Sequence, residues 1–127
     1  MGRRGRRRER SGEAAGQRAG GEMEASSSLY TDPDGGELEL RGSLSARART
    51  RYAQTLGAGR HQEDARQRAI ELLFEQLTVS WTIQGLRIER QQELLRRYRM
   101  AGAQERRFVL DCLSSHLEQN FPEMRAP

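Results

Sequence analysis

Two hydrophobic periods overlap in the middle of this chain. Counted in steps of four and three, one series of positions runs without a break and is apolar at seven of its nine members: Ile70, Phe74, Leu77, Trp81, Gln84, Ile88, Gln91, Leu95 and Tyr98. Alternating steps of four and three are typical of the seam of a coiled coil. The pattern therefore predicts one helix over residues 62–99.

A competing pattern lies inside that helix, in the stretch "QLTVSWTIQG" at residues 76–85. Its apolar residues take every second position: Leu77, Val79, Trp81 and Ile83. Strict alternation favours a half-buried strand, but a strand needs a partner, and the other alternating segment, 37–41, is short and acidic. The helix explains more residues with one period, so we prefer it and expect it to be weakest here. A break at Gly85 is the main alternative.

A second helix is predicted over residues 103–120, where "QERRFVLDCLSSHLEQNF" has a broad apolar face and Pro122 ends it. The connection around Gly102 is short, which makes the two helices antiparallel neighbours. Together they form a predicted helical hairpin over residues 61–121, followed by a tail at 122–127. Residues 43–60 are a possible short helix, capped by Ser43, and a linker.

The N-terminal third is expected to be disordered. Residues 1–28 consist mainly of Arg, Gly, Glu, Ala and Ser, and the segment that follows is acidic with a turn signal at residues 32–36. We therefore assign residues 1–42 to a disordered tail that is first Arg-rich and then acidic. The predicted fold class is mostly α: a disordered N-terminal third followed by an antiparallel helical hairpin with a coiled-coil-like heptad seam.

Charge is concentrated at the N-terminus. The chain has 127 residues and a net charge of +4, and residues 1–22 supply all of it with seven Arg and three Glu. All 22 basic residues are Arg. The basic tail would be a solvated segment without a specific role, or it would serve nucleic-acid contact or nuclear import, although no aromatic residue is interleaved for base stacking. It comprises Arg3, Arg4, Arg6, Arg7, Arg8 and Arg10.

A second group of arginines surrounds the expected hairpin loop. This basic tip would dock an acidic protein surface or a phosphate, or would be a solvated turn favoured by the helix dipole. Its members are Arg96, Arg97, Arg99, Arg106 and Arg107.

Motifs for catalysis, metals and cofactors fail on residue spacing. Cys112 and His116 lie four apart, but the chain has no other Cys, and its other His, His61, offers no third ligand nearby. "GAGR" at residues 57–60 lacks the following glycine of a dinucleotide loop, and the Asp32 region lacks the later ligands of a calcium loop. We expect no enzyme activity, no cofactor and no metal.

The predicted hairpin has too much apolar surface for one short helix to cover. We therefore expect a small non-enzymatic adaptor or subunit that completes a helical bundle or coiled coil with a protein partner or a second copy. The nine seam positions would bind the partner. The alternative is a nucleic-acid-associated protein that uses the basic tail, with the hairpin as its dimerisation unit. No apolar run is long enough to span a membrane and no secretory signal is present, so the expected location is cytoplasmic or nuclear.

Overall fold

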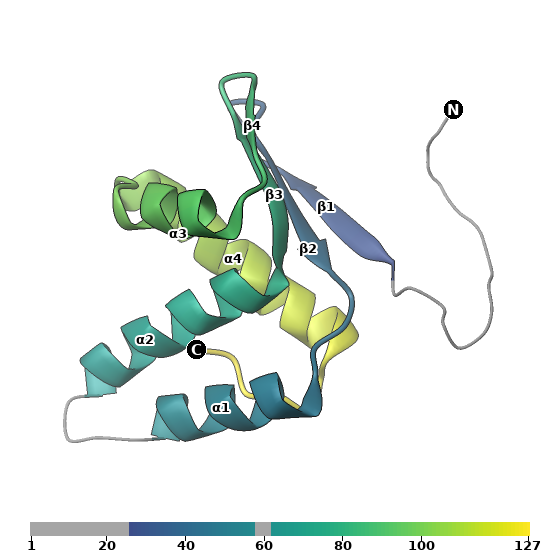
Figure 1. The fold of residues 1–127 in the computed structure, drawn as a ribbon, viewed down its shortest axis with the longest axis vertical. Coiled ribbons are helices and arrows are strands. Elements are labelled where there is room, and N and C mark those ends of the chain that lie inside the picture. Colours follow the sequence, from purple (N-terminus) through teal and green to yellow (C-terminus); the bar gives the residue numbers. More distant parts are fainter. Residues whose placement is uncertain (1–25, 58–61) are drawn as a thin grey trace.

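The computed structural model describes residues 26–57 and 62–127 and combines helices with a sheet (Figure 1). The elements follow in the order β1 (Ser27–Thr31), β2 (Glu37–Arg41), α1 (Ala46–Gly57), α2 (Gln62–Leu77), β3 (Thr78–Ile83), β4 (Leu86–Ile88), α3 (Gln91–Arg99) and α4 (Ala103–Asn120). The four strands form one sheet in the order β1-β2-β3-β4, and every neighbouring pair is antiparallel.

Local turn chemistry explains the two hairpins. In the first, the Asp32 carboxylate accepts hydrogen bonds from the backbone N–H groups of Asp34 and Gly36, at 2.8 and 2.9 Å. In the second, Gln84 and Gly85 both have positive φ, at 51° and 82°. Two consecutive positive φ values give a turn whose twist matches that of the flanking strands. Residues 83–86 therefore reverse the chain rather than continue a helix.

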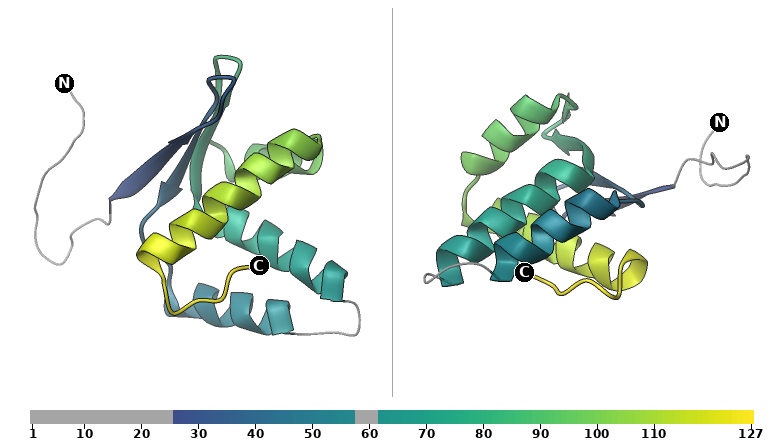
Figure 2. Two further views of the ribbon diagram at one scale, coloured as in Figure 1. Left: turned by 180° about the vertical axis from the view of Figure 1, so that it is seen from behind. Right: turned by 60° about the horizontal axis from the view of Figure 1, so that its bottom comes forward.

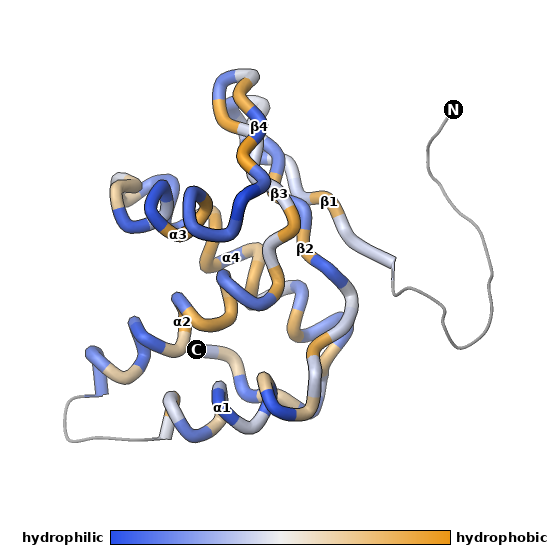
Figure 3. Tube along the Cα trace, in the orientation of Figure 1, coloured by the Kyte–Doolittle hydropathy of each residue, from blue (hydrophilic) through white to orange (hydrophobic). Residues whose placement is uncertain are grey.

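The helices pack on one face of the sheet. Helices α2 and α3 contact β3, and α4 crosses below β2 (Figures 1 and 2). Helix α1 packs beside α2, and the Tyr52 hydroxyl ties it to the C-terminal segment by donating to the Arg125 carbonyl over 2.6 Å. Apolar and charged residues alternate along β2, where Leu38 and Leu40 stand between charged residues, which is how a strand of a sheet covered on one side is built (Figure 3).

The core lies between the sheet and the helices. Leu38, Leu40 and Trp81 point into it from the strands and are 0%, 0% and 1% exposed. The Trp81 ring meets the Phe74 ring edge to face, with centroids 5.7 Å apart, and Phe74 stacks on Tyr98 at 5.0 Å. This aromatic column joins β3 to α2 and α3.

The predicted fold class is wrong. Residues 62–99 form α2, β3, β4 and α3 rather than one helix, so no helical hairpin over 61–121 and no continuous seam exist. The alternation at 77–83 was a true strand signal. Its partner is the segment 37–41, whose two glutamates lie on the exposed face while Leu38 and Leu40 face the core.

The expected disorder of residues 1–42 is also wrong for the part that the structure describes, because β1 and β2 lie there. Residues 1–25 lie outside the described residues. The possible helix in 43–60 exists as α1, and its N-terminus is capped by Ser45, whose hydroxyl accepts from Ala48 N–H at 3.0 Å, rather than by Ser43. The second predicted helix coincides with α4.

Candidate functional site

The nine predicted seam residues do not share a surface. Five of them are buried in the chain's own core: Ile70, Phe74, Leu77, Trp81 and Tyr98. Ile88 and Leu95 are half-buried, and the two glutamines are exposed. Gln84 lies in the β3–β4 turn, while Gln91 begins α3 and donates its side-chain N–H to the Glu75 carbonyl at 3.2 Å. The seam therefore offers no partner a continuous apolar face.

Most of the basic tip holds the fold together. Arg97 pairs with Glu105 at 2.7 Å and lies over the Trp81 ring, and Arg99 pairs with Glu71 at 2.9 Å. Arg106 donates to the carbonyls of Ala101 and Arg99 and lies over the Tyr98 ring. The two remaining members, Arg96 and Arg107, are exposed. The basic tail, Arg3 to Arg10, lies outside the described residues.

The Cys112 and His116 pair belongs to the core. His116 is fully buried, and its Nε2 lies 2.8 Å from the Arg41 carbonyl. Since a carbonyl only accepts, Nε2 carries the proton and Nδ1 accepts the Tyr30 hydroxyl proton at 2.9 Å. Burial lowers the pKa of His116, and burial raises the pKa of Cys112 to about 12. Neutral forms of both groups are thus favoured.

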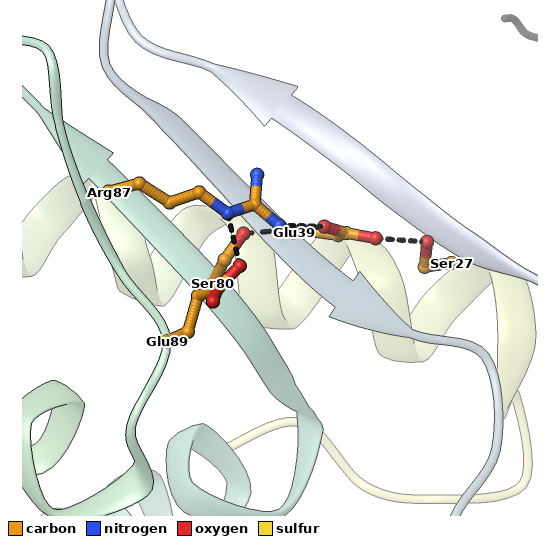
Figure 4. A network of polar contacts seen from close by, with 5 residues as sticks. All are labelled: Ser27, Glu39, Ser80, Arg87 and Glu89. Carbon is orange, nitrogen blue, oxygen red and sulfur yellow. Dashed lines mark hydrogen bonds and ion pairs between the residues drawn. The ribbon is translucent and has the colours of Figure 1, made fainter. Parts of the chain in front are cut away.

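The face of the sheet away from the helices carries a polar network centred on Glu39 (Figure 4). Its carboxylate accepts from the Ser27 hydroxyl at 2.6 Å and from the Ser80 hydroxyl at 3.3 Å. Arg87 lies 3.7 Å from the same carboxylate and also pairs with Glu89. The network joins all four strands on this face and satisfies the charge of Glu39 there.

Strand β1 forms one edge of the sheet (Figures 1 and 2). The Asp32 N–H donates to the Gly36 carbonyl at 2.9 Å, so these two residues form a bonded pair of the hairpin. Bonded and non-bonded pairs alternate along an antiparallel ladder, and the β1–β2 register has no shift. Ser28 and Tyr30 therefore turn their backbone groups toward β2. The backbone groups of the other three residues point outward: Ser27, Leu29 and Thr31.

Side-chain placement agrees with this backbone geometry. Leu29, the middle residue of β1, lies on the open face of the sheet and is 57% exposed. Among the described residues, no strand pairs with the outer edge of β1. The edge therefore combines three residues with outward-facing donors and acceptors and one exposed apolar side chain at their centre.

Sequence reasoning missed this edge, although a signal for it was present. The turn at residues 32–36 was identified, and it is flanked by "SLYT" on one side and "ELEL" on the other. Two short alternating runs around a Gly-containing turn indicate a hairpin. The composition of the preceding residues outweighed that signal.

Compared with protein-family models, curated proteins and solved structures, the chain matches none. Within residues 26–57 and 62–127, no three His, Cys, Asp or Glu side chains gather as a metal site. Over the same residues, no helix combines the length and the apolar character needed to cross a membrane.

Proposed function

We propose that this protein is a non-enzymatic interaction module, a small adaptor or subunit, that binds a protein partner by strand pairing along β1. The supporting observation is the outer edge of β1, where the backbone groups of Ser27, Leu29 and Thr31 point away from the sheet. An added strand gains main-chain hydrogen bonds along such an edge, and alternate side chains give it specificity.

Edges of this kind are usually protected. Natural sheets shield an edge with charged residues, proline, a bulge or a very short strand. Strand β1, "SSLYT", has no charged residue and no proline, spans five residues and pairs with β2 in regular register. The opposite edge, β4, spans three residues and contains Arg87. The contrast between the two edges points to β1 as the binding strand.

The proposal moves the contact from the helices to the sheet. Five of the nine seam residues that were expected to complete a helical bundle are buried in the chain's own core, and the other four do not form a continuous apolar face. The alternative of nucleic-acid binding rests on the basic tail, residues 3–10. The open face of the described sheet adds no support to it, because its outward residues include no aromatic side chain on which a base would stack.

Co-purification with matched surface variants tests the proposal. Leu29→Glu places a charge on the β1 edge, and Leu86→Glu makes the same change at an exposed leucine of β4, which is 66% exposed. Proteins bound through β1 should be lost with Leu29→Glu and retained with Leu86→Glu. Equal recovery with both variants would contradict strand pairing along β1. A separate measurement tests the nucleic-acid alternative. Salt-dependent RNA binding of the full chain is compared with that of a chain lacking residues 1–22, and that alternative expects the deletion to abolish binding.

A further inference from the structure

We infer that the strand which pairs with β1 is β1 of a second copy of this chain, antiparallel to it, with a two-fold axis at Leu29. The inference rests on the proposed function and names its partner. Two protomers would then share one continuous sheet in the order β4-β3-β2-β1-β1-β2-β3-β4. A two-fold axis perpendicular to the sheet keeps both helical layers on the same side, which is the closed, isologous arrangement most common in soluble dimers.

The backbone of β1 is complementary to itself in one register. The outward-facing residues are Ser27, Leu29 and Thr31, and a two-fold axis at the middle one maps this set onto itself. Leu29 then pairs with the partner's Leu29, and Ser27 pairs with the partner's Thr31. Each is a bonded pair that exchanges two hydrogen bonds, so every outward N–H and C=O group of the strand finds a partner.

Sliding the register toward the turn is less favourable. With the axis at Tyr30 instead, Ser27 falls opposite the partner's Pro33, which has no N–H to donate. The axis at Leu29 keeps both prolines outside the paired segment. The structure thus distinguishes one register from its neighbour on hydrogen bonding alone.

Side chains agree with the register that the backbone favours. On the open face the two Leu29 side chains lie directly opposite each other, so each covers apolar surface that is 57% exposed in the single chain. The neighbouring pairs bring Ser27 beside the partner's Thr31, and hydroxyl pairs of this kind favour cross-strand contact. Because β1 has no charged residue, the pairing opposes no like charges.

Sedimentation of the full chain over a range of concentrations tests the inference. The expected result is a reversible dimer of twice the 14.5 kDa chain mass. Leu29→Glu should weaken dimerisation at least about tenfold, because two carboxylates would face each other across the axis. Leu86→Glu, at the other edge, should leave it unchanged. Circular dichroism establishes that both variants are folded, which is essential for Leu29→Glu because position 29 lies opposite Glu39 of the same chain.

A charge-reversal experiment tests the axis itself. Leu29→Glu and Leu29→Arg chains should each be monomeric, and an equal mixture of the two should form a heterodimer, since only an axis at residue 29 brings these positions together. A mixture that stays monomeric, or a wild-type dimer that survives Leu29→Glu, would overturn the inference.

The outcomes also separate the inference from the proposed function. A benzophenone-bearing residue at position 29 of the full chain reports by cross-linking what covers the edge. Cross-linking to a second copy supports the inference. Cross-linking to a different protein overturns the inference but leaves the proposed function standing. Cross-linking to residues 1–25 of the same chain overturns both. A monomer without cross-links at position 29 overturns both.

Discussion

The Tyr30 hydroxyl donates a hydrogen bond to Nδ1 of His116 over 2.9 Å and so ties β1 to α4. The two residues are 86 positions apart in the sequence. His116 also bonds the Arg41 carbonyl at the end of β2, so one buried imidazole fixes both strands of the first hairpin to the helix below them. The edge proposed to bind a partner is held in place by this contact.

Removing the Tyr30 hydroxyl should loosen β1 without repacking the core. Tyr30→Phe keeps the ring that meets His116 edge to face at 5.8 Å but leaves Nδ1 without its hydroxyl donor. We expect a loss of about 1 kcal/mol in the free energy of unfolding. Denaturant unfolding measures the loss, and amide exchange should localise it to Ser28 and Tyr30, whose backbone N–H groups face β2. Unchanged protection of that strand would show that the bond does not anchor it.

Acid should weaken the fold through His116. Burial is the main cause that lowers its pKa below the ordinary 6.5, and the hydrogen bond to Arg41 opposes the shift. The unfolded chain therefore binds more protons than the folded one as the pH falls below 6.5. Stability from this group is fully present above that pH and is lost progressively toward the lowered pKa. Denaturant midpoints measured between about pH 7.5 and about pH 5 report the decline.

Two histidine variants assign that decline. His116→Gln should remove it, whereas His61→Gln, at the other histidine of the chain, should preserve it. An unchanged slope of stability against pH in His116→Gln would place the titrating group elsewhere.

Trp81 should contribute to the free energy of unfolding rather than directly to binding of a partner. Its side chain is 1% exposed and packs against Phe74 and Arg97. Trp81→Ala should therefore cost about 3–5 kcal/mol of unfolding free energy. Gln91→Ala alters an exposed position of the expected seam and removes one hydrogen bond to the Glu75 carbonyl, so it should cost no more than about 1 kcal/mol. Thermal and denaturant unfolding measure the loss of unfolding free energy in each variant. Similar losses in the two would contradict the difference in burial between Trp81 and Gln91.

Thr78 offers a stabilising substitution. Its side chain is 4% exposed, and its Oγ1 has no hydrogen-bond partner among the described residues. Thr78→Val keeps the shape and removes the unsatisfied hydroxyl, so we expect a gain of about 1 kcal/mol in unfolding free energy. The control is Thr82→Val, a half-buried position of the same strand, where the gain should be much smaller. A lower denaturant midpoint for Thr78→Val would indicate a bound water at Oγ1.

Local patterns in the sequence correctly predicted the elements that local interactions determine, such as a single helix or a turn. The apolar face of residues 103–120 and Pro122 predicted α4 with its correct bounds, and the Asp32 to Gly36 turn was identified from composition. The seam failed because two different periods share the same residues. Positions 70, 74 and 77 follow the helical period of α2, and position 81 continues the count by coincidence on β3.

The pairing of β2 with β3 was beyond the reach of local patterns. It pairs Leu38 with Trp81, which are separated in the sequence by α1 and α2, and no pattern in either segment identifies the other as its partner. The candidate site was missed for the same reason, because an edge strand is defined only once the order of strands in the sheet is known. The arginines of the basic tip were interpreted as a binding surface because of their charge. In the structure, Arg97, Arg99 and Arg106 make ion pairs and hydrogen bonds within the chain.

The central position of β2 has a consequence for synthesis of the chain. The β1–β2 hairpin leaves the ribosome before β3, so Leu38 and Leu40 are not covered by residues 78–83 until that later strand follows. During that interval the nascent chain exposes the features that make unpaired strands prone to aggregate. Helices α1 and α2, which separate the two central strands along the chain, can form from local contacts in the meantime. Pairing of β2 with β3 then closes the sheet as a late, long-range step.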